Sequence, residues 1–122
     1  MDGKKELTGY ILAAGSSTRL KELTGDKPKS FLEIKGKRII DYHLDALAKL
    51  GVKDTHIVVG FLKNLFKKTV GGRYKCMNIH YIDNDEYETT GHSQSLFLGR
   101  EIFRSHPILL IHADEFYDPS IL

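Results

Sequence analysis

The sequence predicts an α/β fold, a three-layer sandwich in which helices cover a mostly parallel sheet. Short apolar runs rich in β-branched residues alternate along the 122 residues with segments whose apolar positions recur at helical spacing. Such alternation is typical of parallel sheets, whose strands are joined by crossover helices. Hydrophobic residues make up 41% of the chain and charged residues 28%, so a single domain can bury one modest core.

The first half of the chain is expected to hold two strands and the helix between them. Residues 8–14 (TGYILAA) form an apolar run ended by Gly-Ser-Ser-Thr, which predicts a buried strand entering a polar loop. From Arg38 to Leu50 the apolar residues recur at helical spacing, and Gly51 is typical of a helix end. Residues 55–61 (THIVVGF) are rich in β-branched side chains and predict the second strand.

The second half continues the same alternation. A short helix is expected at residues 62–70, and a third strand at residues 78–82. Residues 95–103 have helical spacing, and residues 107–113 (PILLIHA) form a continuous apolar run suited to a parallel strand buried on both faces. We expect strand one to be central and the functional loops to follow the carboxyl ends of strands, at residues 15–30, 83–94 and 114–119.

The composition excludes several classes of protein. The 18 basic and 16 acidic residues leave a net charge of +2, too even a balance for a nucleic-acid-binding stripe. The single cysteine, Cys76, excludes an internal disulfide framework. No apolar run approaches the roughly 18 residues of a membrane-spanning helix, and the first residues lack the pattern of a secretory signal. We therefore expect a cytoplasmic protein with neither nucleic acid nor membrane as a partner.

The loop after the first strand has the residues of a phosphate site. Small residues at 13–15 let backbone approach a ligand closely, and Ser16 to Thr18 add hydroxyls and N–H groups. Arg19 and Lys29 bring two positive charges to the same rim, which suits a polyphosphate whose charge shifts onto a leaving group. Neither GxxxxGK[ST] nor GxGxxG is present. These residues alone are also compatible with a simple turn and two solvated surface charges.

The complete string in this region, ILAAG followed by x-x-T-R-L-x-x-L-T-x-x-x-P-K, resembles the signature of the sugar-phosphate nucleotidylyltransferases and the related phosphocholine cytidylyltransferases. The resemblance implies a Rossmann-like, GT-A-like nucleotidyltransferase fold. It also implies that Arg19 stabilises the triphosphate during attack and that Lys29 contacts phosphate of the reacting groups. The backbone and loop implied to hold the nucleotide comprise Leu12, Ala13, Ala14, Gly15, Ser16, Ser17 and Thr18.

A second segment, IHYIDNDEYETTGHSQSLFLGREIF, resembles the loop and helix that receive the nucleobase in this family, and is closest to the choline-phosphate type. Gly91 would let the base approach the backbone, and Ser95 is expected near a helix N-terminus facing the ligand. The alternative is an ordinary connection in which Thr90 and Ser93 cap the helix.

A third segment, LLIHADEFYDP, delivers Asp114 to the end of a buried strand. A carboxylate there suits Mg²⁺, which takes one or two carboxylates and completes its shell with phosphate oxygens and water. In the family that the sequence resembles, the matching aspartate binds the catalytic metal. Taken alone, Asp114 is equally compatible with a helix cap or a surface acid.

The resemblance implies an enzyme, a Mg²⁺-dependent nucleotidyltransferase. Its expected partners are a nucleoside triphosphate and a phosphorylated small-molecule acceptor, a sugar 1-phosphate or a phosphocholine-like compound, with release of pyrophosphate. It spans nearly all of this chain but only about the first half of the family's domain, so residues 1–122 are expected to be the nucleotide-binding half. Asp118-Pro119 is a good helix start followed by only three residues, which also indicates a piece of a longer domain.

Two alternatives stay open at this stage. An isoprenoid-type cytidylyltransferase also begins with an ILAAG-like loop and contains a proline-lysine pair, although LKELTGDK favours the sugar and choline-phosphate branch. The other alternative is a non-catalytic nucleotide-binding or regulatory module that lacks the acceptor half. The joint presence of Arg19, Lys29 and Asp114 argues against that module.

Overall fold

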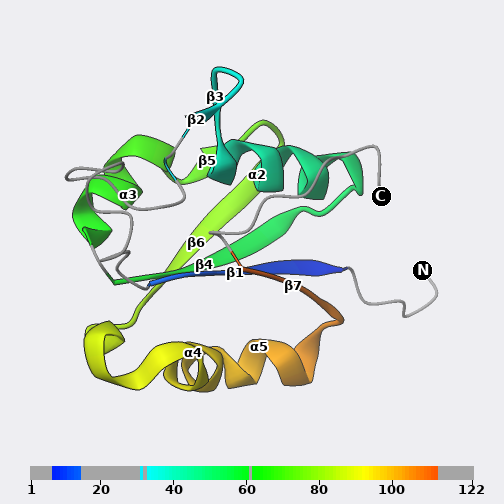
Figure 1. Ribbon diagram of the computed structural model, residues 1–122. Helices are drawn as coiled ribbons and strands as arrows, with labels where there is room; N and C mark the ends of the chain where they lie inside the picture. Colours follow the sequence, from blue (N-terminus) through cyan, green and yellow to red (C-terminus); the bar gives the residue numbers. More distant parts are fainter. Residues whose placement is uncertain (1–6, 15–30, 32, 61, 113–122) are drawn as a thin grey trace.

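A five-stranded sheet forms the middle layer of the molecule (Figure 1). The computed structural model describes residues 7–14, 31, 33–60 and 62–112, with the backbone alone for residues 87–92. The strand order is β5-β6-β4-β1-β7. The strands are β1 (Thr8–Ala13), β4 (Asp54–Val59), β5 (Arg73–Tyr74), β6 (Met77–Asp83) and β7 (Ile108–His112). All neighbours in the sheet are parallel except β5, which is antiparallel to β6.

Helices cover both faces of this sheet (Figure 1). On one face lie α2 (Ile39–Lys49) and α3 (Lys63–Val70), and on the other α4 (Tyr87–Leu98) and α5 (Arg100–Ser105). A small antiparallel pair, β2 (Glu33–Ile34) and β3 (Lys37–Arg38), stands beside α2. The arrangement confirms the predicted three-layer α/β sandwich with a mostly parallel sheet. Strand β1 is an interior strand, paired in parallel with β4 and β7.

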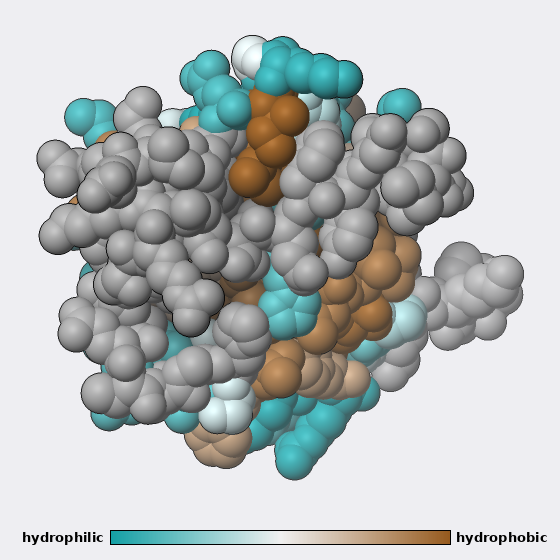
Figure 2. Space-filling model, in the orientation of Figure 1, coloured by the Kyte–Doolittle hydropathy of each residue, from teal (hydrophilic) through white to brown (hydrophobic). Residues whose placement is uncertain are grey.

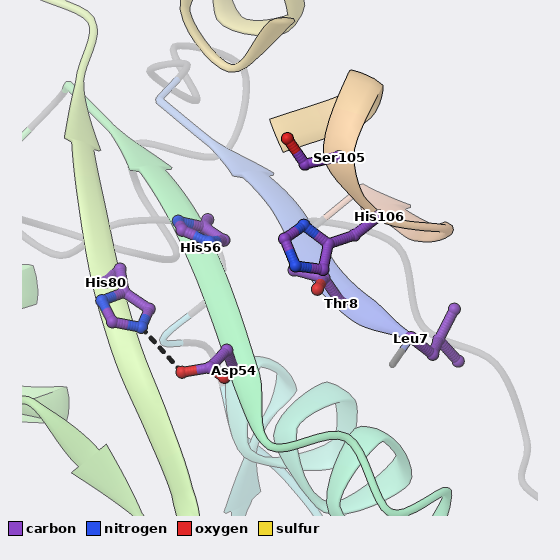
Figure 3. A pocket seen from close by; sticks show the side chains of 7 residues that line it. All are labelled: Leu7, Thr8, Asp54, His56, His80, Ser105 and His106. Carbon is purple, nitrogen blue, oxygen red and sulfur yellow. Dashed lines mark hydrogen bonds and ion pairs between the residues drawn. The ribbon is translucent and has the colours of Figure 1, made fainter. Parts of the chain in front are cut away.

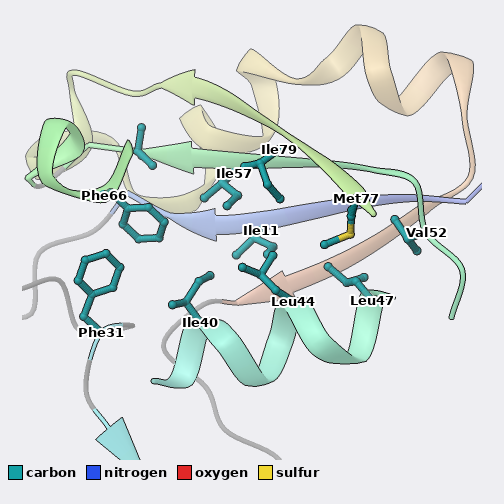
Figure 4. Close-up of a cluster of buried hydrophobic side chains, with 11 residues drawn as sticks. Ile11, Phe31, Ile40, Leu44, Leu47, Val52, Ile57, Phe66, Met77 and Ile79 are labelled. Atoms are coloured by element: carbon teal, nitrogen blue, oxygen red, sulfur yellow. The ribbon is translucent and has the colours of Figure 1, made fainter. Parts of the chain in front are cut away.

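The face under α2 and α3 holds the larger apolar core (Figure 4). Ile40, Leu44 and Leu47 recur at intervals of three and four residues along α2, so they share one side of the helix, and all three are fully buried. Burial of each such side chain contributes about 1.5–3 kcal/mol. The buried residues of this cluster are Ile11, Phe31, Ile40, Leu44, Leu47, Val52, Ile57, Val59, Phe66, Met77 and Ile79.

The face under α4 and α5 has a smaller core built around Tyr10. The ring of Tyr10 is fully buried and meets Phe103 edge-to-face, with ring centroids 4.8 Å apart. Gly99 lies between α4 and α5 directly over this ring, where an added Cβ would lie 2.2 Å from the Tyr10 hydroxyl. Any side chain at Gly99 would therefore push the helices off the sheet. The absence of a side chain is what lets them pack here.

Two expectations need correction. The helix expected at residues 95–103 begins at Tyr87 and is interrupted at Gly99, so most of the loop expected at residues 83–94 is helical. The reason is a tight turn after β6 that residues 84–86 complete. The strand expected to be buried on both faces, β7, leaves Leu110 43% exposed because β7 is the edge of the described sheet. Figure 2 shows apolar surface on this side of the molecule.

Candidate functional site

The carboxyl ends of the four parallel strands share one edge of the sheet. The described chain leaves this edge after Ala13 in β1, Val59 in β4, Asp83 in β6 and His112 in β7. Open α/β sheets bind ligands at this edge. Seven of the predicted site residues lie outside the described residues: Gly15, Ser16, Ser17, Thr18, Arg19, Lys29 and Asp114.

The structure nevertheless describes the strand ends that lead into these segments. Leu12 of β1 pairs in register with His112 of β7, so the two chain segments leave the sheet from neighbouring strands at the same level. The strands that precede the predicted phosphate loop and the predicted metal ligand are therefore neighbours in the sheet. Of the remaining residues predicted in the first segment, Leu12 and Ala14 are buried and Ala13 is half-buried. The side chains of these residues pack within the molecule, and Leu12 and Ala13 are also paired with β4 in the sheet.

Asn84 is the polar centre of the described part of this edge. Its side chain is 1% exposed, and its Nδ2 donates a hydrogen bond to Ser95 Oγ over 3.1 Å. Its Oδ1 accepts from the backbone N–H of Glu86 over 3.1 Å, and its own N–H donates to the Val59 carbonyl over 2.7 Å. One residue thus joins the end of β4, the start of α4 and the interior of α4.

The network continues from α4 to β1. The Tyr10 hydroxyl donates to the Ser95 carbonyl oxygen over 2.5 Å. Burial raises the pKa of Tyr10 to about 12, so this hydroxyl stays protonated and keeps donating throughout the physiological range. Ser95 is 2% exposed and is therefore held on both its side-chain and its main-chain oxygen.

The predicted base-binding residues Gly91 and Ser95 both lie within α4. Ser95 was expected near a helix N-terminus; that placement is wrong, because α4 begins at Tyr87. The alternative in which Thr90 and Ser93 cap a helix is also wrong, since both residues lie inside α4 and Glu86 occupies the cap position. The first turn of α4 follows the carboxyl end of β6 directly, so the N-terminal half of the helix stands at the expected ligand edge.

Ion pairs fill the edge between α3 and β6. Lys63 Nζ lies 2.6 Å from Asp85 Oδ1 and 3.5 Å from Asp83 Oδ2, and Lys67 Nζ lies 2.8 Å from Asp83 Oδ1. The hydrogen bond from Lys67 lowers the pKa of Asp83. Among the described residues no group of three or more histidine, cysteine, aspartate or glutamate side chains is placed to hold a metal ion. These acids are thus engaged by lysines.

A family model described as the MobA-like NTP transferase domain matches residues 9–122. The match covers the carboxyl ends of β1 and β7, helix α4 and all the predicted site residues. This chain belongs to that family.

Relatives of this MobA-like NTP transferase domain are nucleotidyltransferases. The chain is 35% identical over 112 residues to the CMP-5'-(3-aminopropyl)phosphonate synthase of Streptomyces rubellomurinus, covering 92% of the chain and 18% of that protein. It is 31% identical to the CTP:phosphoglutamine cytidylyltransferase of Campylobacter jejuni, covering 91% of the chain and 45% of the relative. The chain spans less than half the length of either curated relative.

A solved structure is similar in fold over nearly the whole MobA-like domain. The CTP:phosphocholine cytidylyltransferase of Streptococcus pneumoniae superposes with a TM-score of 0.82 at 29% identity. The superposition covers 96% of this chain and 49% of that protein. None of the described helices of this chain is both long enough and apolar enough to cross a membrane.

The MobA-like domain has a second polar region at the opposite, amino edge of the sheet (Figure 3). A cavity of about 260 Å³ lies there, lined by Leu7, Thr8, Asp54, His56, His80, Ser105 and His106. The rings of His56 and His80 stack with centroids 4.8 Å apart, and His80 Nε2 lies 2.9 Å from Asp54 Oδ1. Burial lowers the pKa of His56, and the neighbouring His80 lowers it further.

Sequence reasoning did not single out Asn84 or Tyr10. A signal existed for Asn84, since an asparagine directly after a strand can turn the chain through its own side chain. For Tyr10 the local sequence offered only an apolar strand, and its partner Ser95 lies 85 residues away.

Proposed function

We propose that the intact protein transfers a nucleotidyl group from a nucleoside triphosphate to a phosphorylated small molecule and releases pyrophosphate. The observation that carries this proposal is the match of residues 9–122 to the NTP transferase family, with the signature loop leaving an interior parallel strand. In this proposal residues 1–122 are the nucleotide-binding half, and the protein acts in the cytoplasm.

The reaction needs no protein nucleophile. The acceptor phosphate is already anionic, and in-line attack on the α-phosphate is accelerated by positioning and by neutralisation of charge. Arg19 would stabilise the triphosphate as pyrophosphate departs, and Lys29 would contact phosphate of the reacting groups. The backbone of Leu12 to Gly15 and the hydroxyls of Ser16, Ser17 and Thr18 would hold the nucleotide phosphates.

We propose Mg²⁺ as the cofactor, held by Asp114 together with phosphate oxygens and water. When bound, such an ion neutralises charge on the phosphates. The placement of β7 beside β1 supports this role, because Asp114 follows β7 within two residues of His112. The described acids at the edge do not offer a competing site, since lysines engage Asp83 and Asp85.

Cytidine triphosphate is the first nucleotide to test. Two relatives with more than 30% identity, from Streptomyces and Campylobacter, have CMP or CTP in their names. Their acceptors, as named, are a phosphonate and a phosphorylated amino acid derivative. We therefore propose small phosphorylated or phosphonylated acceptors rather than large ones.

Pyrophosphate release tests the proposal. The intact protein is incubated with Mg²⁺, each nucleoside triphosphate and a panel containing phosphocholine, aminoalkylphosphonates and sugar 1-phosphates. We expect acceptor-dependent release of pyrophosphate with one preferred nucleotide, and one new product of the corresponding mass. Tight nucleotide binding without product for any acceptor would instead identify a non-catalytic nucleotide-binding module.

Arg19→Ala tests the assigned role of Arg19. Loss of one preorganised charge is expected to cost roughly 3 kcal/mol, or about 100-fold in kcat, while nucleotide affinity falls much less. The matched control is Arg104→Ala, an exposed arginine on α5 that pairs only with Glu101 in the described structure. Equal losses in affinity and turnover would mean that Arg19 merely holds the substrate.

Asp114→Asn tests the metal assignment without relying on activity. Calorimetric titration of nucleotide with and without Mg²⁺ should show that metal strengthens nucleotide binding in the wild type and not in the variant. Asparagine keeps the shape and removes the charge. Equal enhancement by Mg²⁺ in both proteins would assign Asp114 to a helix cap.

A further inference from the structure

Asn84 is buried among three polar partners, one at the end of β4, one at the start of α4 and one inside α4. Its backbone N–H donates to the carbonyl of Val59, the last residue of β4. Its Oδ1 accepts from the N–H of Glu86 at the start of α4, and its Nδ2 donates to Ser95 Oγ inside α4. A buried amide that lost one of these partners would leave an unsatisfied polar group, which destabilises the folded arrangement. An apolar side chain could fill the space but could not specify the orientation of α4. The polar contacts therefore add directional constraints to the apolar packing that holds the helix on the sheet.

Because α4 is a continuous helix, the contacts at Ser95 also affect the position of its N-terminal half at the carboxyl edge of the sheet. The helix begins at the carboxyl edge, directly after the turn at residues 84–86. Gly91 precedes Ser95 by four residues, so it lies on the same side of the helix, about one turn or 5.4 Å nearer the helix start. Movement at Ser95 would move Gly91 with it.

Tyr10 fixes the other side of the same helix. Its hydroxyl holds the Ser95 carbonyl, and Tyr10 stands on β1 two residues before Leu12, where the nucleotide segment begins. The chain of bonds from Asn84 through Ser95 to Tyr10 thus connects the two segments that are proposed to hold the two ends of the nucleotide. One end receives the phosphates and the other receives the base.

We propose that Asn84 is a positioning residue for the nucleobase: it sets the place of the N-terminal half of α4 relative to the phosphate loop. The inference rests on the proposed function. Asn84 does not touch the nucleotide in this proposal, because its side chain is 1% exposed and already engaged. Its loss weakens recognition of the base and leaves recognition of the phosphates intact.

Two ligands distinguish recognition of the base from recognition of the phosphates. One is the preferred nucleoside triphosphate, and the other is inorganic tripolyphosphate, which has the phosphates and no base. Calorimetry on the intact protein should show Asn84→Ala weakening nucleotide binding about 3- to 10-fold, which corresponds to the free energy of about one of the two side-chain hydrogen bonds that the variant loses. Binding of tripolyphosphate should change less than about twofold, and KM for the nucleotide should rise with kcat nearly unchanged. The matched control is Asn78→Ala on β6, the strand that Asn84 follows; this variant removes an exposed contact with Asp54 at the amino edge.

A second variant keeps the test decisive if Asn84→Ala folds poorly. Asn84→Asp retains an oxygen for the N–H of Glu86. When ionised, it can only accept at Ser95, so the Ser95 hydroxyl must reverse its hydrogen bond, and a charge is buried at a site built for a neutral amide. Burial should raise the pKa of the new carboxyl, and its protonated form can donate. Nucleotide affinity of Asn84→Asp, divided by that of the wild type at the same pH, should therefore recover as the pH is lowered.

The measured affinities distinguish a positioning role of Asn84 from a purely structural one. Equal weakening of nucleotide and tripolyphosphate, or a loss of thermal stability with both affinities unchanged, would overturn the positioning role and leave Asn84 as a structural residue. If the wild type binds nucleotide but transfers it to no acceptor, the proposed enzymatic function fails while the two affinities still decide the role of Asn84. If the wild type binds no nucleotide, both proposals fall.

Discussion

The two faces of the sheet have different chemistry. Under α2 and α3 the buried cluster consists of aliphatic and aromatic side chains with Met77, and its largest members are fully buried. Under α4 and α5 the apolar cluster is small, and it is flanked by the Asn84 network at the carboxyl edge and by the histidines at the amino edge. Stability is therefore concentrated on one face. The other face holds buried polar groups at both edges of the sheet.

The first way to test this comparison is to damage the apolar face. Leu44→Ala should lower the free energy of unfolding by about 2–5 kcal/mol, because Leu44 is fully buried between α2 and the sheet and its loss leaves a cavity. Denaturant unfolding measures the change. Leu50→Ala, at a residue 62% exposed just after α2, is the control and should cost less than about 0.5 kcal/mol.

The same variant tests the separation of roles between the faces. Under conditions where Leu44→Ala stays folded, its nucleotide affinity should match the wild type. A large loss of affinity in the folded variant would show that the α2 face also shapes the ligand edge.

The second test adds side-chain volume to the core under α4 and α5. Gly99→Ala places a methyl group 2.2 Å from the Tyr10 hydroxyl, so α4, α5 or the ring must move, at a cost of about 1–3 kcal/mol. Gly72→Ala is the matched control, since an added Cβ there meets nothing within 4 Å. Thermal unfolding of the two variants measures the difference. Equal stability would mean that the contact between Tyr10 and the helix junction is loose.

The third test concerns a charged contact on the rim of the apolar face. Asp45 on α2 accepts hydrogen bonds from Tyr74 and from the ammonium groups of Lys37 and Lys75. Burial by itself would raise the pKa of Asp45, but these partners outweigh it and lower the pKa to about 2.

Asp45→Asn should therefore cost about 1–2 kcal/mol at pH 7, with the full charge effect reduced by solvent screening. A carboxyl whose pKa is lowered in the folded state stabilises it above the unfolded pKa, here 3.8. The difference between wild type and variant should shrink as the pH falls from 3.8 towards 2. Chemical unfolding at several pH values measures this, and a difference independent of pH would contradict it.

Periodicity in the sequence predicts most of the sheet and the helices of the apolar face. The spacing in α2 and the β-branched run of β4 locate both elements within one or two residues. The start of α4 was missed because residues 86–94 (EYETTGHSQ) are polar and include Gly91, so they lack an apolar helical pattern. There the start of the helix is set by the turn at Asn84, and the body of the helix is held by contacts of Ser95 with Asn84 and Tyr10.

The site divides in the same way. Backbone and strand-end positions such as Leu12 to Ala14 follow from a local motif, so sequence can predict where they leave the sheet. The contacts that hold Ser95 could not be predicted, because Asn84 and Tyr10 lie 11 and 85 residues away from it in sequence. Only the packing of α4 across the sheet brings them together.

The smallest expected change in the free energy of unfolding comes from the histidines that face one another at the amino edge of the sheet. His56 on β4 is faced by His80 on β6, by Asp54 on its own strand and by His106 after α5. Burial lowers the pKa of His56 most, and the charges of His80 and His106 lower it further. The charge of Asp54 acts in the opposite direction and raises it. A histidine whose pKa is lowered on folding binds protons more readily when unfolded. The free energy of unfolding should therefore fall as the pH drops below 6.5, the ordinary value, towards the lowered pKa of the folded state. His56→Gln removes this contribution, so its stability should decline less than that of the wild type between pH 7 and the acid limit of the folded protein. His80→Gln is the informative comparison: it removes a neighbouring charge, so the pKa of His56 measured by NMR titration should rise towards 6.5. A pKa of His56 that stays low in His80→Gln would exclude His80 as the cause and assign the shift to burial and to the charge of His106.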